Sequence, residues 1–132
     1  MAVSICKAIL QGELQRVWTL VTDVSGYAAW RGDLDRTQVL SEAQFVEYTK
    51  DGYATTFTVT ACEPYSRWEF DLENQRIRGH WTGRFRAQGN TTQVEFTEEA
   101  IPKNKLLSPF VKPYLKRQQA RFLADLAGAL EK

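Results

Sequence analysis

The sequence predicts an α+β domain in which helices cover one face of an antiparallel sheet. Three patterns indicate this fold: a β-branched and apolar run at residues 2–10, an alternating apolar and polar region at residues 34–101, and a helical period over residues 103–132. Turn signals divide the alternating region into about six strands. With 132 residues and no shift in composition, we expect one domain spanning residues 1–132.

Two short helices are predicted between Gln11 and Trp30. Leu14, Val17 and Val21 repeat at i, i+3 and i+7, which is typical of an amphipathic helix. Residues 25–26 (Ser-Gly) then predict a break before a second, shorter helix.

The final helix is predicted from one apolar stripe. With a period of 3.6 residues it contains Leu107, Val111, Leu115, Gln118, Phe122, Leu126 and Leu130. Pro109 and Pro113 predict an irregular or kinked start.

Three turn signals predict the strand register: Asp51-Gly52, Asn74-Gln75 and Gly89-Asn90. As two-residue loops they pair Val46 with Phe57 and Tyr48 with Thr55, then Leu72 with Ile77, Phe70 with Gly79 and Trp68 with Trp81, then Phe85 with Val94, Gly83 with Phe96 and Trp81 with Glu98. A slip of one residue would exchange the two faces of a strand, so a buried aromatic face specifies the register.

The two predicted faces differ sharply in polarity. The inner face carries Val46, Tyr48, Tyr53, Thr55, Phe57, Val59, Trp68, Phe70, Trp81, Phe85, Val94 and Phe96. The outer face carries Glu47, Thr56, Thr58, Glu69, Asp71, Arg78, His80, Thr82, Arg84, Arg86, Glu95, Thr97 and Glu99, and pairs Asp71 with Arg78 and Arg84 with Glu95.

An aromatic face of this width needs a cover, and the final helix is the only long one. A twisted sheet curls around such a helix, and one helix leaves part of the concavity unfilled. Gly79 and Gly83, on either side of Trp81, would leave further space. The pattern therefore fits an internal cavity and fits a dry core of packed rings equally well.

The chain resembles the SRPBCC superfamily, the START and polyketide-cyclase-like helix-grip domains that include relatives of the birch-pollen allergen. The resemblance rests on Val17-Trp18, Asp23, residues 27–30, 63–68, 79–85 and 91–96, and the final amphipathic helix. It implies a curved sheet of seven strands that grips the last helix, with a hydrophobic cavity between them. The family contains lipid and hormone binders and polyketide aromatases, cyclases and dehydratases, so the fold alone does not decide the function.

Glu98 is the candidate catalytic residue, because the register places this carboxyl among inward rings. Burial there would raise its pKa and suit it to act as an acid, a base or a ligand anchor. The alternatives are a bulge that turns the side chain away, or neutralisation by Arg31 or Arg76. The candidate ligand-binding residues are Tyr48, Tyr53, Thr55, Phe57, Trp68, Phe70, Trp81, Phe85, Phe96, Glu98, Val111 and Phe122, although the first three also fit a core or rim position.

His80, the only histidine, is predicted on the outer face between Glu69 and Glu99. Such flanking carboxylates raise the pKa of a histidine, and three ligands in a flat row suit zinc poorly. Cys6 and Cys62 have no metal-ligand spacing and no inward histidine to activate them. With no phosphate loop or dinucleotide fingerprint either, we expect no metal and no cofactor.

The charge pattern excludes some partners and leaves others open. A formal net charge of +1 gives no global attraction to nucleic acid, and no apolar run approaches the ~18 residues of a membrane span. The N-terminus lacks the features of a secretory signal, and two free thiols fit a reducing cytoplasm. A basic run of Lys103, Lys105, Lys112, Lys116, Arg117 and Arg121 fits a solvated helix face, or contact with an acidic headgroup, carrier protein or membrane surface.

Three functions follow as hypotheses. The first is binding of a small hydrophobic or aromatic molecule, lipid- or polyketide-like, by a monomer or homodimer. The second is a cyclase, aromatase or dehydratase that moves protons with Glu98 or a tyrosine. The third is a protein-interaction module without a ligand. Acid–base catalysis needs converging polar groups, and the sequence predicts only one inward carboxyl and no inward histidine, which favours the binder.

Overall fold

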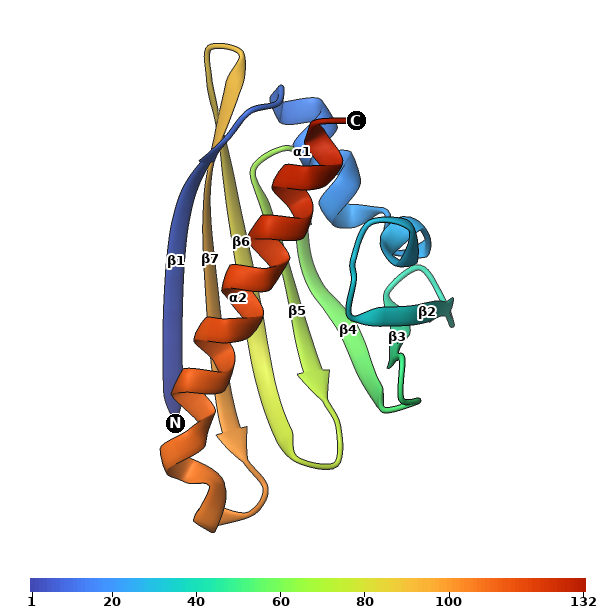
Figure 1. Cartoon of the computed structure of the whole chain (residues 1–132), viewed down its shortest axis with the longest axis vertical. Helices are drawn as coiled ribbons and strands as arrows, with labels where there is room; N and C mark the ends of the chain where they lie inside the picture. Colours follow the sequence, from blue (N-terminus) through green and yellow to red (C-terminus); the bar gives the residue numbers. More distant parts are fainter.

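One curved antiparallel sheet and one long helix account for most of the chain (Figure 1). The computed structural model describes residues 1–132 and confirms the α+β class. The strands are β1 (Ala2–Leu10), β2 (Leu34–Val39), β3 (Gln44–Thr49), β4 (Ala54–Glu63), β5 (Arg67–Glu73), β6 (Ile77–Gln88) and β7 (Thr91–Pro102), in the sheet order β1-β7-β6-β5-β4-β3-β2. The helices are α1 (Leu14–Thr22), the 3₁₀ turns η1 (Val24–Ala29) and η2 (Lys105–Leu107), and α2 (Ser108–Leu130).

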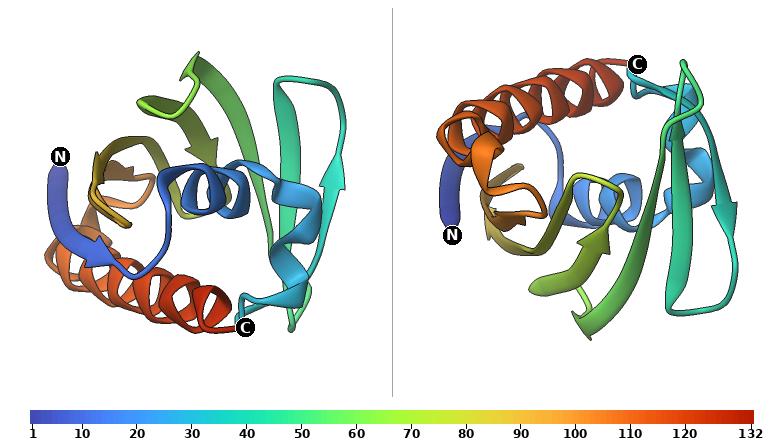
Figure 2. Two further views of the ribbon diagram at one scale, coloured as in Figure 1. Left: turned by 90° about the horizontal axis from the view of Figure 1, so that it is seen from above. Right: turned by 90° about the horizontal axis from the view of Figure 1, so that it is seen from below.

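The helix α2 crosses the concave side of the sheet, and α1 and η1 lie at the end where the chain terminates (Figures 1 and 2). Arg16 on α1 donates hydrogen bonds to the carbonyl oxygens of Ala129, Leu130 and Lys132 at the C-terminal end of α2, where helical carbonyls need partners from outside the helix. In the middle of α2, the amide of buried Gln119 bonds to strands β1 and β7.

The start and the buried stripe of α2 differ from the sequence prediction. Residues 103–107 form a loop and a 3₁₀ turn, so the helix begins at Ser108 with Pro109 in its first turn. Gln119 is buried where the stripe predicts Gln118, because the stripe drifts around the helix as it crosses the curved sheet.

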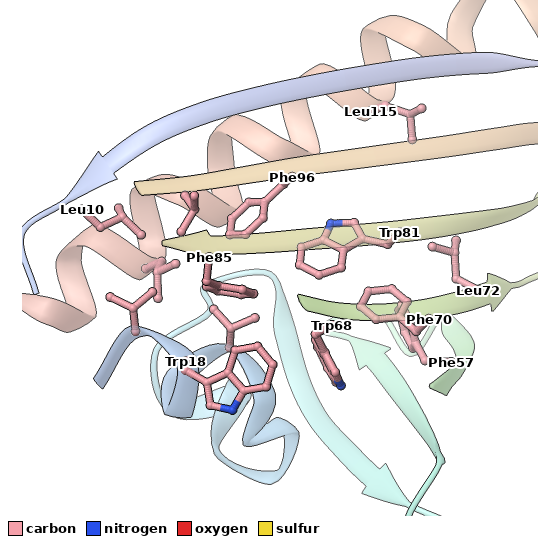
Figure 3. Packing of buried hydrophobic residues seen from close by; sticks show 14 of the residues in the cluster. Leu10, Trp18, Phe57, Trp68, Phe70, Leu72, Trp81, Phe85, Phe96 and Leu115 are labelled. Atoms are coloured by element: carbon pink, nitrogen blue, oxygen red, sulfur yellow. The ribbon is translucent and has the colours of Figure 1, made fainter. Parts of the chain in front are cut away.

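Aromatic rings from the sheet and from α1 pack together in the space between the sheet and the helices (Figure 3). Phe70 and Trp81 stack on adjacent strands with ring centroids 4.9 Å apart. Trp18 from α1 packs edge-on against Phe85, at 5.0 Å. Gly83 makes room for this packing, because a Cβ added there would lie 2.5 Å from the indole of Trp81.

Two of the three predicted registers place the side chains on the correct face. The Gly89-Asn90 turn gives the predicted pairs, Trp81 with Glu98 among them. The Asn74-Gln75 loop is longer than predicted, because the Asn74 side chain accepts hydrogen bonds from two following backbone amides. Its strands are therefore offset by two residues, which keeps the faces and changes the partners: Trp68 lies opposite Gly83, Phe70 opposite Trp81, Leu72 opposite Gly79, and Asp71 opposite His80 instead of Arg78.

The Asp51-Gly52 turn is predicted wrongly by one residue. Thr49 and Tyr53 close a three-residue loop in which Gly52 has φ +85°, a type I turn with a glycine bulge. Tyr48 therefore lies opposite Ala54, and Val46 opposite Thr56. Glu47, predicted on the outer face, points into the concave side instead.

Candidate functional site

Two adjoining hollows lie between the sheet and α2. The inner cavity has a volume of about 140 Å³, and an outer cleft of about 440 Å³ opens beside it. Asn74, Ile77 and Tyr114 line both. The outer cleft lies under the first turns of α2, at the end of the sheet opposite α1.

The inner cavity has an aromatic wall and a polar wall. The aromatic and aliphatic lining comes from Leu34, Phe57, Phe70, Leu72, Ile77, Trp81, Phe96 and Phe122. The polar lining comes from Tyr27, Arg31, Asp33, Glu47, Thr49, Thr55, Asn74, Glu98, Tyr114, Gln118 and Gln119.

The candidate ligand-binding residues divide into three groups. Those that line the inner cavity are Thr55, Phe57, Phe70, Trp81, Phe96, Glu98 and Phe122, whereas Tyr53 and Val111 line the outer cleft. Trp68 and Phe85 belong to the packed core and reach neither hollow. Tyr48 points outward, where its hydroxyl bonds to Gln38 and Arg36 stacks on its ring.

Glu98 reaches the cavity from β7, opposite Trp81. Burial raises the pKa of its carboxyl to about 7, the charge of Glu47 adds to the rise, and Arg31 counteracts it. No side chain or backbone group of the chain hydrogen-bonds to the Glu98 carboxyl. It is therefore an acid with an available proton and an available acceptor oxygen.

A buried ion cluster forms the polar wall beside Glu98. Arg31 donates to Glu47 at 2.9 Å and to Asp33 at 3.2 Å. Its guanidinium also lies over the rings of Tyr27 and Phe122, 5.1 and 5.2 Å from their centroids. Desolvation still raises the pKa of Glu47, although Arg31 counteracts it. Both terminal nitrogens of Arg31 are thus held by carboxylates.

Sequence reasoning missed this cluster because of the single-residue register error at Asp51-Gly52. The available signal was the loop itself, since Asp-Gly also ends three-residue loops in which glycine adopts the left-handed conformation. Glu47 gives the site a second inward carboxyl, which corrects the expectation of a single one.

Most other polar groups of the cavity are already satisfied. The Tyr27 hydroxyl donates to the Val21 carbonyl, and the Asn74 amide donates to Thr55 at 3.1 Å. Gln119 holds α2 to Ser4. Tyr114 and Gln118 join Glu98 as lining groups with no hydrogen-bond partner, and the Tyr53 hydroxyl in the outer cleft is buried without one.

His80 lies on the outer face, as predicted, and Glu99 is its strand partner on β7. On β5 the predicted partner Glu69 is wrong: the two-residue offset places Asp71 opposite His80. Its ring nitrogens lie 2.7 Å from Asp71 and 2.7 Å from Glu69. Partial burial favours the neutral ring, but these hydrogen bonds outweigh it and raise the pKa of His80. The cluster is an ion network outside the cavity, and no group of three potential ligands has a metal-binding arrangement.

The remaining predicted features do not line the inner cavity. Cys6 and Cys62 are free thiols. Within the basic run, Arg117 lines the outer cleft and Lys103 pairs with Glu73 at 2.7 Å. None of the helices combines the length and the apolar character that a bilayer crossing requires.

Comparison with known proteins connects this geometry to a family. Residues 8–131 match the family model described as polyketide cyclase/dehydrase and lipid transport. No curated protein matches in sequence. Among solved structures, a START superfamily protein from Mycobacterium smegmatis aligns with a TM-score of 0.90 at 12% identity, over 98% of this chain and 97% of its own.

Two further solved structures have the same fold. The Zhui aromatase/cyclase from a Streptomyces species aligns with a TM-score of 0.84 at 14% identity, covering 98% of this chain and 93% of its own. A conserved protein from Geobacillus kaustophilus aligns with a TM-score of 0.85 at 14% identity, covering 98% and 95%. At these identities the likeness establishes a shared fold.

Proposed function

The chain belongs to the polyketide cyclase/dehydrase and lipid transport family, and from that premise we propose that it binds a small, ring-containing, largely apolar molecule between the sheet and α2. The observation that carries the proposal is the aromatic wall of a cavity that also holds an unpartnered carboxyl. Apolar pockets with a few placed polar groups are the usual form of small-molecule sites.

The sizes of the two hollows suggest how such a ligand would lie. A cavity of about 140 Å³ accommodates about one aromatic ring. The outer cleft, at about 440 Å³, has the volume of an ordinary ligand pocket. The proposed ligand therefore places one ring beside Glu98 and extends past Ile77 toward Tyr114.

Binding can be tested with the fluorescent probe phenylnaphthylamine. We expect saturable probe fluorescence with the wild-type protein and quenching of Trp81, which lines the cavity. Ile77→Trp should weaken binding about tenfold or more, because residue 77 lines both hollows. The matched control is Ile101→Trp, which adds the same ring at a residue that lines neither of these hollows. No saturable binding to the wild type would contradict the proposal and favour an interaction module.

A second function, proton transfer of the cyclase or dehydratase type, is favoured by one observation. A carboxyl whose pKa is about 7 exists in both forms near neutral pH and can act as base or acid. The carboxylate would take a proton from a carbon next to a ligand carbonyl and return one to the resulting enolate.

Deuterium exchange tests the proton-transfer function directly. With benzylacetone in heavy water, proton NMR should record faster loss of the protons next to the carbonyl when the protein is added. Glu98→Gln should abolish the acceleration, whereas Glu99→Gln, which removes the neighbouring outward carboxyl, should retain it. Equal acceleration by both variants would exclude Glu98 as the base.

The cellular setting is part of the same proposal. Both cysteines are free, which is usual in a reducing compartment such as the cytoplasm. A monomer or a homodimer is compatible with a pocket built from one chain.

A further inference from the structure

The inner cavity carries more negative than positive charge. Asp33, Glu47 and Glu98 line it, and Arg31 is its only cation. Arg31 is held by two of these carboxylates and by two aromatic rings. Only its Nε lacks a hydrogen-bond partner, and three carboxyl groups face this one guanidinium.

Among the lining groups at that end without a hydrogen-bond partner, which are the Glu98 carboxyl, the Gln118 amide, the Tyr114 hydroxyl and Arg31 Nε, only Glu98 is acidic. The Glu98 carboxyl has no partner within the chain and faces the ring-sized part of the cavity. The charged and titratable groups around it are Glu47 on β3, Arg31 and Asp33 before β2, Tyr114 on α2 and Cys6 on β1. Only Arg31 is positive among them, and its charge is already compensated.

We propose that the inner cavity selects ligands whose ring carries a hydrogen-bond donor, most strongly an amine, and rejects ligands that end in a carboxylate. An ammonium or phenol placed beside Glu98 would donate to its free carboxylate oxygens in a desolvated site, where charge-assisted hydrogen bonds are strong. A carboxylate in the same place would add a fourth negative group to a wall that holds three carboxyl groups and one guanidinium. This inference rests on the proposed binding function and narrows its ligand class to aromatic amines and phenols, and it excludes ligands that would place a carboxylate beside Glu98. Arg76 and Arg117 line the outer cleft, so the selection concerns the inner end alone.

A set of four probes with one shape tests the selection. Para-pentylbenzylamine, para-pentylphenol, pentylbenzene and para-pentylbenzoate share the ring for the inner cavity and a tail for the outer cleft. Isothermal titration at about pH 8, where Glu98 is largely ionised, should give affinities in that order. The amine should bind about tenfold or more tightly than pentylbenzene, and the benzoate more weakly than pentylbenzene.

Two variants assign the effect to Glu98. Glu98→Gln should reduce the amine-to-pentylbenzene ratio to near one and leave the affinity for pentylbenzene within about threefold. Glu99→Gln makes the same charge change one residue along, on the outer face, and should keep the wild-type ratio.

The results of these titrations distinguish failure of the proposed selection from failure of the proposed binding function. If the protein binds pentylbenzene, and binds the amine and the benzoate with equal affinity, the proposed selection is wrong and the proposed binding function stands. Tightest binding of the benzoate would overturn the selection as well. No binding of any of the four probes to the wild type would overturn both proposals. An amine preference that survives in Glu98→Gln would show that another group recognises the donor, which also overturns this inference.

Discussion

Glu98 links the stability of this protein to its site. Folding raises the pKa of its carboxyl from an ordinary 4.5 to about 7. Between these pH values the folded state binds more protons than the unfolded state, so stability falls as pH rises through this window and then levels off. The destabilisation above the window is roughly 3 kcal/mol at most. A buried acid that lowers stability is a common feature of functional sites.

Glu98→Gln should remove this pH dependence. The amide has nearly the same shape and carries no charge, so the variant should be more stable than the wild type by roughly 1–3 kcal/mol at about pH 8 and nearly equal to it at about pH 4. Urea unfolding at the two pH values measures the difference. Glu99→Gln is the control. A variant that is less stable at both values would mean that the Glu98 carboxyl makes a stabilising interaction.

His80 gives a pH dependence of the same sign through a different mechanism. The two carboxylates 2.7 Å from its ring nitrogens raise the pKa of the imidazole above its ordinary value, against the effect of partial burial. The stabilisation by charged His80 is complete below the unfolded-state pKa and is lost as pH rises through the folded-state pKa.

NMR titration of the His80 ring should therefore give a pKa above that of an unperturbed histidine. Asp71→Asn should lower the value, because it removes one of the two negative partners. A pKa below the unperturbed value in the wild type would mean that desolvation outweighs the carboxylates and would contradict this network.

At the scale of elements, substitutions of one glycine in β6 and one in α2 test whether ring packing or backbone propensity determines the residue at each position. Gly83→Ala should destabilise the protein by about 1–3 kcal/mol, because the added Cβ would lie 2.5 Å from the indole of Trp81 and the strand cannot move away. Gly128→Ala adds the same methyl group in α2, where nothing lies within 4 Å, and should stabilise by up to about 1 kcal/mol. Thermal unfolding of the two variants measures both signs. Equal effects would show that backbone propensity and not ring packing decides the role of Gly83.

The element scale also shows how far sequence reasoning reaches. The alternation of apolar and polar residues predicted the strands and the aromatic face, because burying one face leaves a period of two in the sequence. An offset of two residues at Asn74-Gln75 kept that face, so Phe70, Trp81 and Glu98 point inward as predicted. An offset of one residue at Asp51-Gly52 exchanged the two faces of β3, so Glu47 was wrongly predicted on the outer face.

The remaining features of the site depend on contacts between distant segments. Arg31 meets Glu47 only after the loop behind η1 folds against β3. Trp68 and Phe85 satisfy the same pattern as Trp81 but lie where α1 and neighbouring rings fill the space. A period of two identifies a buried face, and the packing of the covering helices then decides which part of that face remains open.

At the scale of the whole molecule, the two ends of α2 are held very differently. Its C-terminal half is fixed by the Arg16 hydrogen bonds to its last carbonyls and by the Gln119 bonds to the sheet. Its first turns have no hydrogen bond to the sheet, and Pro113 leaves the carbonyl of Pro109 without its helical partner. The outer cleft lies under these first turns.

This asymmetry predicts where the molecule opens to admit a ligand. Segments with few buried contacts and missing hydrogen bonds open at a lower free energy than the global unfolding. Backbone amides of residues 108–116 should therefore exchange with heavy water faster than those of residues 119–130, and bound phenylnaphthylamine should slow the first group selectively, because the probe would bridge Ile77 and Tyr114. Hydrogen exchange read by NMR resolves the two groups. Arg16→Ala serves as the contrast: it should speed exchange near Leu130 and leave probe affinity unchanged, since the cleft lies at the other end. If the probe protected residues 119–130 instead, entry would lie at the α1 end, and the outer cleft would not be the route to Glu98.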